Sequence, residues 1–482
     1  MQYARDTYRS MEAMVEPETG LVDDNIEGSL DPATRGGYTS PTNIGAWLWS
    51  TVVARELHLI SRGEARERMA LTLETLAQLE RHPQSGMFYN WYDPATLEKL
   101  RVWPENGSTV YPFLSSVDNG WLAAAFMVVR SAEPQLRDEA EALLYSMDFG
   151  FFYDPLAKGP DVPAGLMRGG FWDEPPPDCG VLGNYRGGGP DVWYTCHHYG
   201  ALNSETRAIS YIAIALGQVP QEHYFAIWRT FPPTCDWSWQ EQLPVGEWEE
   251  HLGVPVFQGA YQYRGVQLVP SFGGDMFEAL MPDLFVPESR WAPESWGHNH
   301  PLQVWAQIEH GMVEADYGYW GFSPASDPLG GYREYGVEVI GMSTDGYASD
   351  VERTNVDIGF GDCRPAQPMP EFGEGVVTPH AAFLALPYAP DAAMANLANI
   401  KSDFDAYGPG GFYDAIAVDT GRVARRHLSL DQGMIMGALG NVLARGVLHK
   451  SFTVGEVRRT LPQLLAIEKF NVSSSVPPIA SS

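Results

Sequence analysis

Residues 40–80 have the sequence SPTNIGAWLWSTVVARELHLISRGEARERMALTLETLAQLE, which predicts a helical hairpin. The first helix follows a capping cluster that begins at Ser40, and its apolar residues recur at helical spacing: Ile44, Trp47, Leu48, Val52 and Leu57. The second helix follows a capping box, in which Ser61 stands three residues before Glu64. A hairpin of this kind is a building unit of all-α folds.

The same pattern continues along the chain. Further helices are predicted at residues 118–130, 134–148, 203–217, 220–230, 274–285, 300–315, 378–387, 390–406, 429–446 and 453–468. About twelve helices paired in sequence predict an all-α fold, an (α/α)6 toroid with long loops and a few short β-strands around its cleft. An α-solenoid is the competing fold, but its repeats would have a fixed period, and none is visible.

We expect one domain at residues 41–470, preceded by an N-terminal extension at 1–40 and followed by a flexible tail at 471–482. Long loops in a compact domain are usually functional, so the walls of the cleft are expected in the longest ones. These loops are rich in Gly, Pro and Trp, include strand-like fragments such as 261–268, and lie at residues 155–200, 231–273 and 317–377.

Composition excludes some partners. The 482-residue chain has 31 Lys and Arg against 61 Asp and Glu, a formal net charge of −30, which repels nucleic acid and anionic lipid. No apolar run is long enough to span a membrane, and the first residues lack the apolar core of a signal peptide. We expect a periplasmic or secreted protein if a leader has been removed, and a cytoplasmic one otherwise. The oligomeric state stays open.

The four cysteines, Cys179, Cys196, Cys235 and Cys363, lack the C-x-x-C spacing of zinc sites and dithiol redox motifs. Free or loosely paired thiols are expected, although Cys179 and Cys196 could bridge in an oxidising compartment. The His197-His198 pair and the histidines at 298 and 300 lack the spacing of zincin ligands, so no metal site is predicted. The chain has no P-loop, dinucleotide fingerprint or nucleophile elbow, so no cofactor is predicted either.

Aromatic residues make up 12% of the chain, with 15 Trp and 23 Tyr, and sugar rings stack on such faces. Large toroids also bury aromatic rings between their helices, so each ring has a structural alternative. Residues 86–93, GMFYNWYD, follow a helix and predict a sugar subsite with Tyr89, Trp91 and Asp93.

Three carboxylates stand at predicted helix starts. Asp118 precedes an apolar helix that contains Trp121, and capping alone would explain it. Glu205 lies beside Arg207 at the start of a nonpolar helix, where partial burial could raise its pKa and the arginine could lower it. Asp431 lies at the start of another apolar helix late in the chain and is the leading candidate for a second carboxylate beside Glu205. Glu374, in a loop before a helix, is the alternative candidate.

Together these segments resemble the glucoamylase-like glycoside hydrolases: the endo-β-1,2-glucanases of glycoside hydrolase family 144 and the cyclising domain of cyclic β-1,2-glucan synthases. The resemblance extends over most of the chain. Its pieces are PTNIGAWLWSTVVARELHLI from Pro41, FYNWYDPATLEKL from Phe88, SSVDNGWLAAA from Ser115, NSETRAISYIAIALGQVPQEHY from Asn203, SFGGDMFEALMP from Ser271, YWGFSPAS from Tyr319, VVTPHAAFLALPYAPDAAMANL from Val376, GGFYDAI from Gly410 and DQGM from Asp431.

The resemblance implies that Glu205 is the general acid, that Asp431 belongs to the water-activating side, and that Asp118 binds sugar. Synthase-type domains have a glutamate in a WGISES-like segment, where this chain has proline, in Trp320-Gly321-Phe322-Ser323-Pro324. Because proline cannot be a nucleophile, we predict an inverting hydrolase, whose acid and base would lie roughly 6.5–9.5 Å apart.

The primary hypothesis is an enzyme, a glycoside hydrolase that cleaves a β-glucan, in the first place β-1,2-linked, with Glu205, Asp431 and Asp118 as catalytic residues and an oligo- or polysaccharide as partner. Alternatives are a transglycosylase of the cyclic glucan synthase type, a hydrolase of another bacterial glycan, a polysaccharide lyase and a non-catalytic glycan-binding protein. The predicted substrate-binding residues are Tyr89, Trp91, Asp93, Trp121, Arg207, Phe277, Glu278, Trp320 and Glu374.

Overall fold

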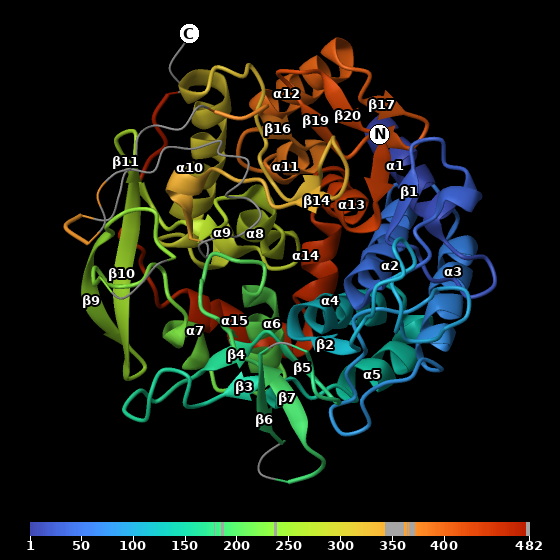
Figure 1. Ribbon diagram of the computed structural model, residues 1–482, viewed down its shortest axis with the longest axis horizontal. Helices are drawn as coiled ribbons and strands as arrows, with labels where there is room; N and C mark the ends of the chain where they lie inside the picture. The colour runs from blue at the N-terminus through green and yellow to red at the C-terminus, as the bar shows by residue number, and fades with distance from the viewer. Residues whose placement is uncertain are drawn as a thin grey trace.

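The computed structural model describes residues 1–177, 179–184, 188–235, 239–342, 361–363, 365 and 372–478. Among the helices of these residues we find none with the length and apolar character that a membrane crossing requires. The helices, shown in Figure 1, are α1 (Gln2–Met14), α2 (Pro41–Glu56), α3 (Arg62–Leu76), α4 (Ser116–Ala132), α5 (Arg137–Tyr145), α6 (Arg207–Ala215), α7 (His223–Ala226), α8 (Met276–Leu280), α9 (Glu288–Trp291), α10 (Trp296–Glu309), α11 (Pro379–Leu384), α12 (Pro390–Asp403), α13 (Ser429–Leu443), α14 (Val447–Phe452) and α15 (Gly455–Leu465).

Short strands occupy the connections between helices. They form small sheets, of which the largest has the order β2-β5-β7-β6 and all but one, β12-β15, are antiparallel within the described residues. The strands are β1 (Asn25–Glu27), β2 (Phe113–Ser115), β3 (Tyr153–Asp154), β4 (Leu166–Arg168), β5 (Gly170–Trp172), β6 (Gly180–Gly183), β7 (Val192–Thr195), β8 (His198–Tyr199), β9 (Val245–His251), β10 (Val254–Tyr263), β11 (Val266–Leu268), β12 (Ser271–Phe272), β13 (Ala325–Ser326), β14 (Tyr332–Arg333), β15 (Gly341–Met342), β16 (Val376–Val377), β17 (Tyr407–Gly408), β18 (Gly411–Phe412), β19 (Ala415–Ala417), β20 (Arg422–Ala424) and β21 (Arg426–Leu428).

The predicted hairpin forms as α2 and α3, with the caps that the sequence indicates. The hydroxyl of Ser40 accepts a hydrogen bond from the backbone N–H of Asn43, and that of Ser61 accepts one from Glu64. α2 is buried along nearly its whole length, whereas α3 is buried only on one side. The first helix of the pair is therefore an interior helix, and the second lies at the surface.

Several predicted helices are shorter in the structure. The helix predicted at 203–217 begins only at Arg207, and the segment 220–230 keeps a single turn, α7. The helix predicted at 274–285 ends as α8 at Leu280, since Pro282 has no N–H to continue it. The prediction also missed the short helices α9 and α14 and the longer α1. In the N-terminal extension, α1 buries Ala4, Tyr8 and Met11 and packs against α13.

Glycine allows the inner helices to approach closely. A Cβ atom at Gly433 of α13 would lie 2.6 Å from the Cβ of Ala46 in α2. One at Gly120 of α4 would lie 2.1 Å from a methyl group of Ile209 in α6. Neither position has room for a side chain, so these glycines set the spacing of the helix pairs α2–α13 and α4–α6.

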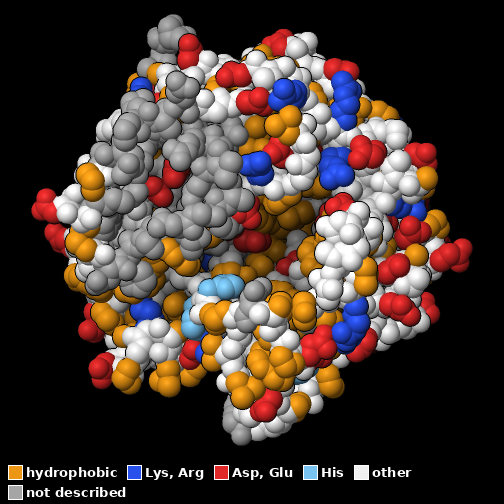
Figure 2. Space-filling model, in the orientation of Figure 1, with side chains coloured by type: hydrophobic (Ala, Val, Ile, Leu, Met, Phe, Trp, Pro, Cys, Tyr) orange, Lys and Arg blue, Asp and Glu red, His pale blue; other side chains and the backbone are white. Residues whose placement is uncertain are grey.

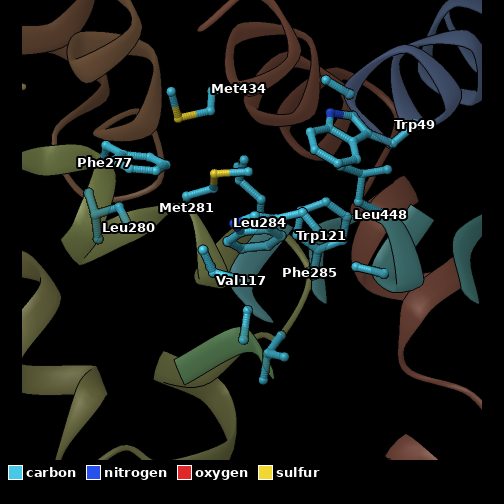
Figure 3. Close-up of a cluster of buried hydrophobic side chains, with 14 of the residues drawn as sticks. Trp49, Val117, Trp121, Phe277, Leu280, Met281, Leu284, Phe285, Met434 and Leu448 are labelled. Atoms are coloured by element: carbon cyan, nitrogen blue, oxygen red, sulfur yellow. The ribbon is translucent and has the colours of Figure 1, made fainter. Parts of the chain in front are cut away.

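The core lies among these inner helices. Figure 3 shows Trp49, Trp121 and Phe285 from three parts of the chain meeting there. The ring centroids of Trp49 and Trp121 lie 5.2 Å and 5.5 Å from that of Phe285. Such tilted aromatic contacts stabilise a core beyond simple burial.

The expectation of free thiols is wrong, whereas the possible bridge between Cys179 and Cys196 does form. Cys179 pairs with Cys196 and Cys235 pairs with Cys363, with Cα–Cα distances of 5.9 Å and 5.2 Å. The second bridge joins residues 128 positions apart. Sequence spacing alone could not reveal a pair brought together by the fold. Both bridges lie in the long loops that were predicted to form the walls of the cleft.

Candidate active site

Two neighbouring cavities meet at Glu205. The first, of about 520 Å³, extends from Glu205 to His198 and Trp239. The second, of about 410 Å³, extends from Glu205 to Asp118 and Asp431. Glu205, Phe277, Tyr332 and Leu430 line both. Figure 2 shows a hollow near the middle of one face, where hydrophobic and acidic side chains meet. Glu205 is thus open to solvent-accessible space on two sides.

The turn before α6 places Glu205. Its backbone N–H donates to Oε2 of Glu278 over 2.7 Å, and its own Oε2 accepts a 2.5 Å hydrogen bond from the indole Nε1 of Trp121. Burial, together with the neighbouring carboxylate of Glu278, raises the pKa of Glu205 well above its ordinary value. The carboxyl group therefore keeps its proton at a pH where an exposed glutamate is ionised.

Asp118 lies in the first turn of α4, whose N-cap is Ser115. Its carboxylate is not engaged in capping: Oδ1 accepts a 2.6 Å hydrogen bond from the hydroxyl of Thr42 in α2. Burial raises the pKa of Asp118, although hydrogen bonds with Ser115 and Thr42 oppose this effect. A carboxyl group held from two helices and facing the cavity is suited to binding a sugar hydroxyl.

Asp431 lies in the first turn of α13 and is 3% exposed. Burial raises its pKa to about 7, while a hydrogen bond from Asp414 opposes the rise. Burial and the charge of Asp431 raise the pKa of Asp414 well above its ordinary value. Two adjacent carboxyl groups cannot both ionise easily, so the pair shares a proton, and Asp414 is the member that keeps it longer.

Neighbouring polar groups contact both carboxyl groups of this pair, Asp414 and Asp431. Oδ2 of Asp414 accepts a 2.6 Å hydrogen bond from the backbone N–H of Ser326. Nδ1 of His380 lies 3.3 Å from Oδ2 of Asp431, and the pKa of this buried histidine falls to about 4 because of desolvation. At neutral pH the imidazole of His380 is therefore uncharged and does not lower the pKa of Asp431 as a cation would.

Sequence reasoning missed several carboxylates of the site, among them Asp24, Glu334 and Asp414. Asp24 lies in the segment expected to be an extension, and the amide of Asn43 donates to it over 2.8 Å. Glu334 lines the first cavity, where its charge adds to those that raise the pKa of Glu205. None of the three begins a predicted helix, so no local signal in the sequence marks them.

The aromatic residues expected at the site are divided between cavity and core. Trp91 lines the second cavity with Tyr38 and Trp103, and the centroids of the three rings lie 4.5–5.5 Å apart. Tyr89 does not reach either cavity, since it is 2% exposed and its hydroxyl donates to Asp173. Phe277 and Glu278 line the first cavity, and Trp121 lies beneath it as the donor to Glu205.

Arg207 does not line either cavity, contrary to expectation. It is fully buried and donates to both oxygens of Glu288, over 2.7 Å and 2.9 Å. Burial would raise the pKa of Glu288, but Arg207 and His300 lower it to about 2. One ligand atom each of Asp283, Glu288 and His300 lie within 4.8 Å of one another, and the guanidinium group supplies the positive charge of this cluster.

Three further predicted residues lie outside both cavities. Asp93 caps a turn by accepting hydrogen bonds from the backbone N–H groups of residues 95 and 96. Trp320 is 2% exposed, and its backbone is bound by the amide of Asn396. Glu374 forms an exposed ion pair with Arg422 at 3.2 Å, so it is not the second carboxylate. The local sequence around these three residues does not show that they lie outside the cleft.

Two family models and a curated protein match parts of this chain. The family model described as "Putative glucoamylase" matches residues 246–455, and the one described as "Protein of unknown function (DUF3131)" matches residues 2–150. The cyclic β-(1,2)-glucan synthase NdvB of Rhizobium meliloti is 26% identical over 344 residues. The resemblance to the glucoamylase-like glycoside hydrolases is confirmed. The match with NdvB covers 68% of this chain but only 9% of the synthase, so the chain spans a small part of that relative's length.

Solved structures of this group share the fold. The endo-β-1,2-glucanase from Chitinophaga pinensis, solved with sophorotriose and glucose, has a TM-score of 0.65 at 17% identity, and the match covers 96% of each chain. The endo-β-1,2-glucanase from Talaromyces funiculosus, solved with sophorose, has a TM-score of 0.64 at 14% identity, over 99% of this chain and 92% of that one. At these identities the likeness is one of fold.

Proposed function

We propose that this protein hydrolyses β-1,2-glucan, with Glu205 as general acid and Asp431 as general base. The observation that carries the proposal is that these two carboxyl groups, from distant parts of the chain, line one open cavity of about 410 Å³. An inverting glycosidase needs one protonated carboxyl group for the leaving oxygen and one carboxylate for the attacking water. The two raised pKa values fit these two roles.

The reaction follows from the protonation states. Glu205, whose pKa is raised well above its ordinary value, donates its proton to the glycosidic oxygen. Asp431, once ionised above its pKa of about 7, takes a proton from water, and the hydroxyl oxygen attacks the anomeric carbon. Asp118 holds a sugar hydroxyl between the two groups. One water is consumed and two shorter glucans are released.

The choice of substrate is supported by the relatives and by the aromatic lining. The similar synthase and glucanases are described as acting on β-1,2-glucan or as bound to sophorose and sophorotriose. In this chain Tyr38, Trp91 and Trp103 offer apolar ring faces beside Asp118. A neutral glucan can stack on these rings, and the acidic surface does not repel it.

We further infer that the inner helices close into an (α/α)6 ring. α2 packs against α4 and α13, α4 against α6, and α11 against α8 and α13. Between α6 and α8 the connection is Arg207, whose guanidinium donates to the backbone carbonyls of Glu278 and Ala279 over 3.0 Å and 2.7 Å. In Figure 1 these six helices lie around the middle of the view, where Figure 2 has its hollow. The ring would form the proposed single domain at residues 41–470.

A retaining transglycosylase of the cyclic glucan synthase type is the second candidate, and Glu334 favours it. Although Pro324 replaces the glutamate expected there, Glu334 brings a carboxylate to the first cavity near Glu205 and Glu278. A retaining enzyme needs such a nucleophile about 5 Å from its acid. The similarity to NdvB points the same way.

We also propose a periplasmic or secreted location. Disulfides persist in oxidising compartments, and the two bridges of this chain hold loops that carry cavity residues. Cys196 immediately precedes His197 of the first cavity. Reduction would therefore loosen the wall of the cleft.

The function is tested by incubating the protein with linear and cyclic glucans of several linkages and separating the products by chromatography. We expect depolymerisation of β-1,2-glucan, and a loss of roughly 10²-fold or more in kcat for Glu205→Gln. Glu80→Gln, which removes an exposed carboxylate paired with Lys99, is the matched control and should retain full activity. An unchanged rate for Glu205→Gln would exclude the proposed acid, and an unsaturated product would identify a lyase.

A further inference from the structure

A third cavity, of about 450 Å³, lies beyond the first one and away from Glu205. Its lining includes Lys158, Trp228, Phe231, Trp239 and Trp248, and we call it the distal pocket. The aromatic residues come from the connections before β9 and from β9 itself. Cavities with an apolar, aromatic lining and few polar groups are the usual form of ligand sites.

The distal pocket adjoins the first cavity. His198, Gly200 and Trp239 line both the distal pocket and the first cavity. The backbone joins the two regions as well, because the N–H of Trp228 donates to Gly200 over 2.8 Å and the N–H of Leu202 donates to Trp228 over 2.7 Å. A ligand long enough to pass Trp239 from the cleft therefore arrives in this pocket.

The rings of the pocket meet mainly by their edges. Trp228 contacts Phe231 and Trp248 at interplanar angles of 70° and 75°, and Phe231 contacts Trp239 at 68°. Among the described residues, the ring contacts of Trp239 and Trp248 are all tilted or edge-to-face, and none of them is a parallel stack. Trp248 is 55% exposed, an unusual position for so large an apolar side chain. Packing alone does not explain why this ring remains at the surface.

Lys158 is a basic residue of the lining, so its protonation state affects the charge of the distal pocket. Its ammonium nitrogen lies 2.8 Å from the centroid of the Trp228 ring and donates to the carbonyl of Ala226 over 3.0 Å. Burial, with a contribution from Arg229, lowers the pKa of Lys158 to about 6, so most of the amine is uncharged at neutral pH. Trp248 is flanked along β9 by Glu247 and Glu249. Among the described lining residues, an anionic ligand meets no permanently charged cation, whereas a neutral sugar ring meets apolar side chains and one amine.

We propose that the distal pocket binds a glucosyl residue of the substrate remote from the bond that is cleaved, by stacking it on Trp248 and Trp239. This inference rests on the proposed function, since the occupant is the far part of the glycan held at Glu205. Chains long enough to extend from Glu205 through the first cavity gain this contact, and shorter chains do not. The pocket thereby sets a preference for long substrates.

The test uses the Glu205→Gln protein, which should bind without turnover, and a series of β-1,2-glucan oligosaccharides of increasing length. Isothermal titration calorimetry should show Kd falling with length and then levelling off. Adding Trp248→Ala should weaken binding of the long chains by about 2- to 10-fold, the range expected for one aromatic contact, and change the Kd of the short chains less than 2-fold.

Tyr145→Ala is the matched control, because it removes an equally exposed aromatic ring from α5. It should leave every Kd unchanged. If the Trp248→Ala and parent proteins bind long chains with equal affinity, the proposed role of the distal pocket is wrong and the proposed function stays intact. Binding of a glucan of another linkage, with the same length-dependent loss, would refute the β-1,2 assignment but support the pocket. Absence of binding to any glucan would overturn both.

Discussion

The indole N–H of Trp121 and the carboxyl group of Glu205 are joined by a hydrogen bond of 2.5 Å, although 84 residues separate them in the chain. Trp121 is 1% exposed and packs on Phe285 in the core. The orientation of the proposed acid is therefore set by a side chain that cannot move without disturbing the core. This link connects the helix packing directly to the chemistry of the cleft.

Trp121→Phe should change the pH dependence of kcat/KM and leave the fold largely intact. The substitution keeps an aromatic ring but removes the donor that stabilises the ionised form of Glu205. We expect the basic limb of kcat/KM to move up by about 1–2 pH units, as for loss of one hydrogen bond to a charged group. Trp49→Phe is the control, because its indole donates to the carbonyl of Gly433 in the same core. A profile displaced equally in both variants would contradict the role of Trp121.

The shared proton of Asp414 and Asp431 gives a second prediction. Asp414 donates to Asp431 and so lowers the pKa of the proposed base. Asp414→Ala removes the donor, and the acidic limb of kcat/KM should move up by about 1–2 pH units. Asp414→Asn keeps an N–H donor and should leave the limb nearly in place. If Asn and Ala displace the limb equally, Asp414 is not the member that holds the proton.

The interior helices, and Glu205 as a candidate acid, could be predicted from the sequence because their signals are local. Caps and apolar spacing predicted α2 and α3, and Glu205 stood out before a nonpolar helix. Arg207 could not be placed, since its partner Glu288 is 81 residues away and the pair forms only when α6 and α9 meet. Asp414 and Asp24 were missed for the same reason. Their function depends on contacts with α13 and α2 that no neighbouring residue indicates.

Breaking the buried ion pair of Arg207 and Glu288 should strongly destabilise the folded protein. Arg207→Met leaves Glu288 buried without its cation, and we expect a loss of about 3–5 kcal/mol in the free energy of unfolding, measured in urea. Arg422→Ala breaks an exposed pair with Glu374 and should cost less than about 1 kcal/mol. Similar losses of unfolding free energy in the two variants would show that breaking the buried pair is no more destabilising than breaking the exposed one.

Stability should fall as the pH rises from about 4 to 7. Asp431 and Glu278 have pKa values of about 7 in the folded protein, above the ordinary values of 3.8 and 4.5. The folded state therefore binds protons more tightly than the unfolded state, and this stabilisation is lost as the pH passes through the folded values. Glu288, with a pKa of about 2, acts in the opposite sense below about pH 4.5.

Urea unfolding between pH 4 and 8 measures this dependence. Asp414→Asn should flatten it, because the variant removes one carboxyl group with a raised pKa. Asp405→Asn changes a carboxylate that is 79% exposed and should leave the slope as it is. A rise in stability between pH 5 and 7 would contradict the assigned directions.

Proton NMR of the first products released from linear β-1,2-glucan tests the pairing of Glu205 with Asp431 most directly. An enzyme that activates water with Asp431 inverts the anomeric carbon, so the new reducing ends should appear first as the α-anomer and convert slowly to the β-anomer. First products in the β-configuration would contradict the account and assign the nucleophile to a carboxylate such as Glu334.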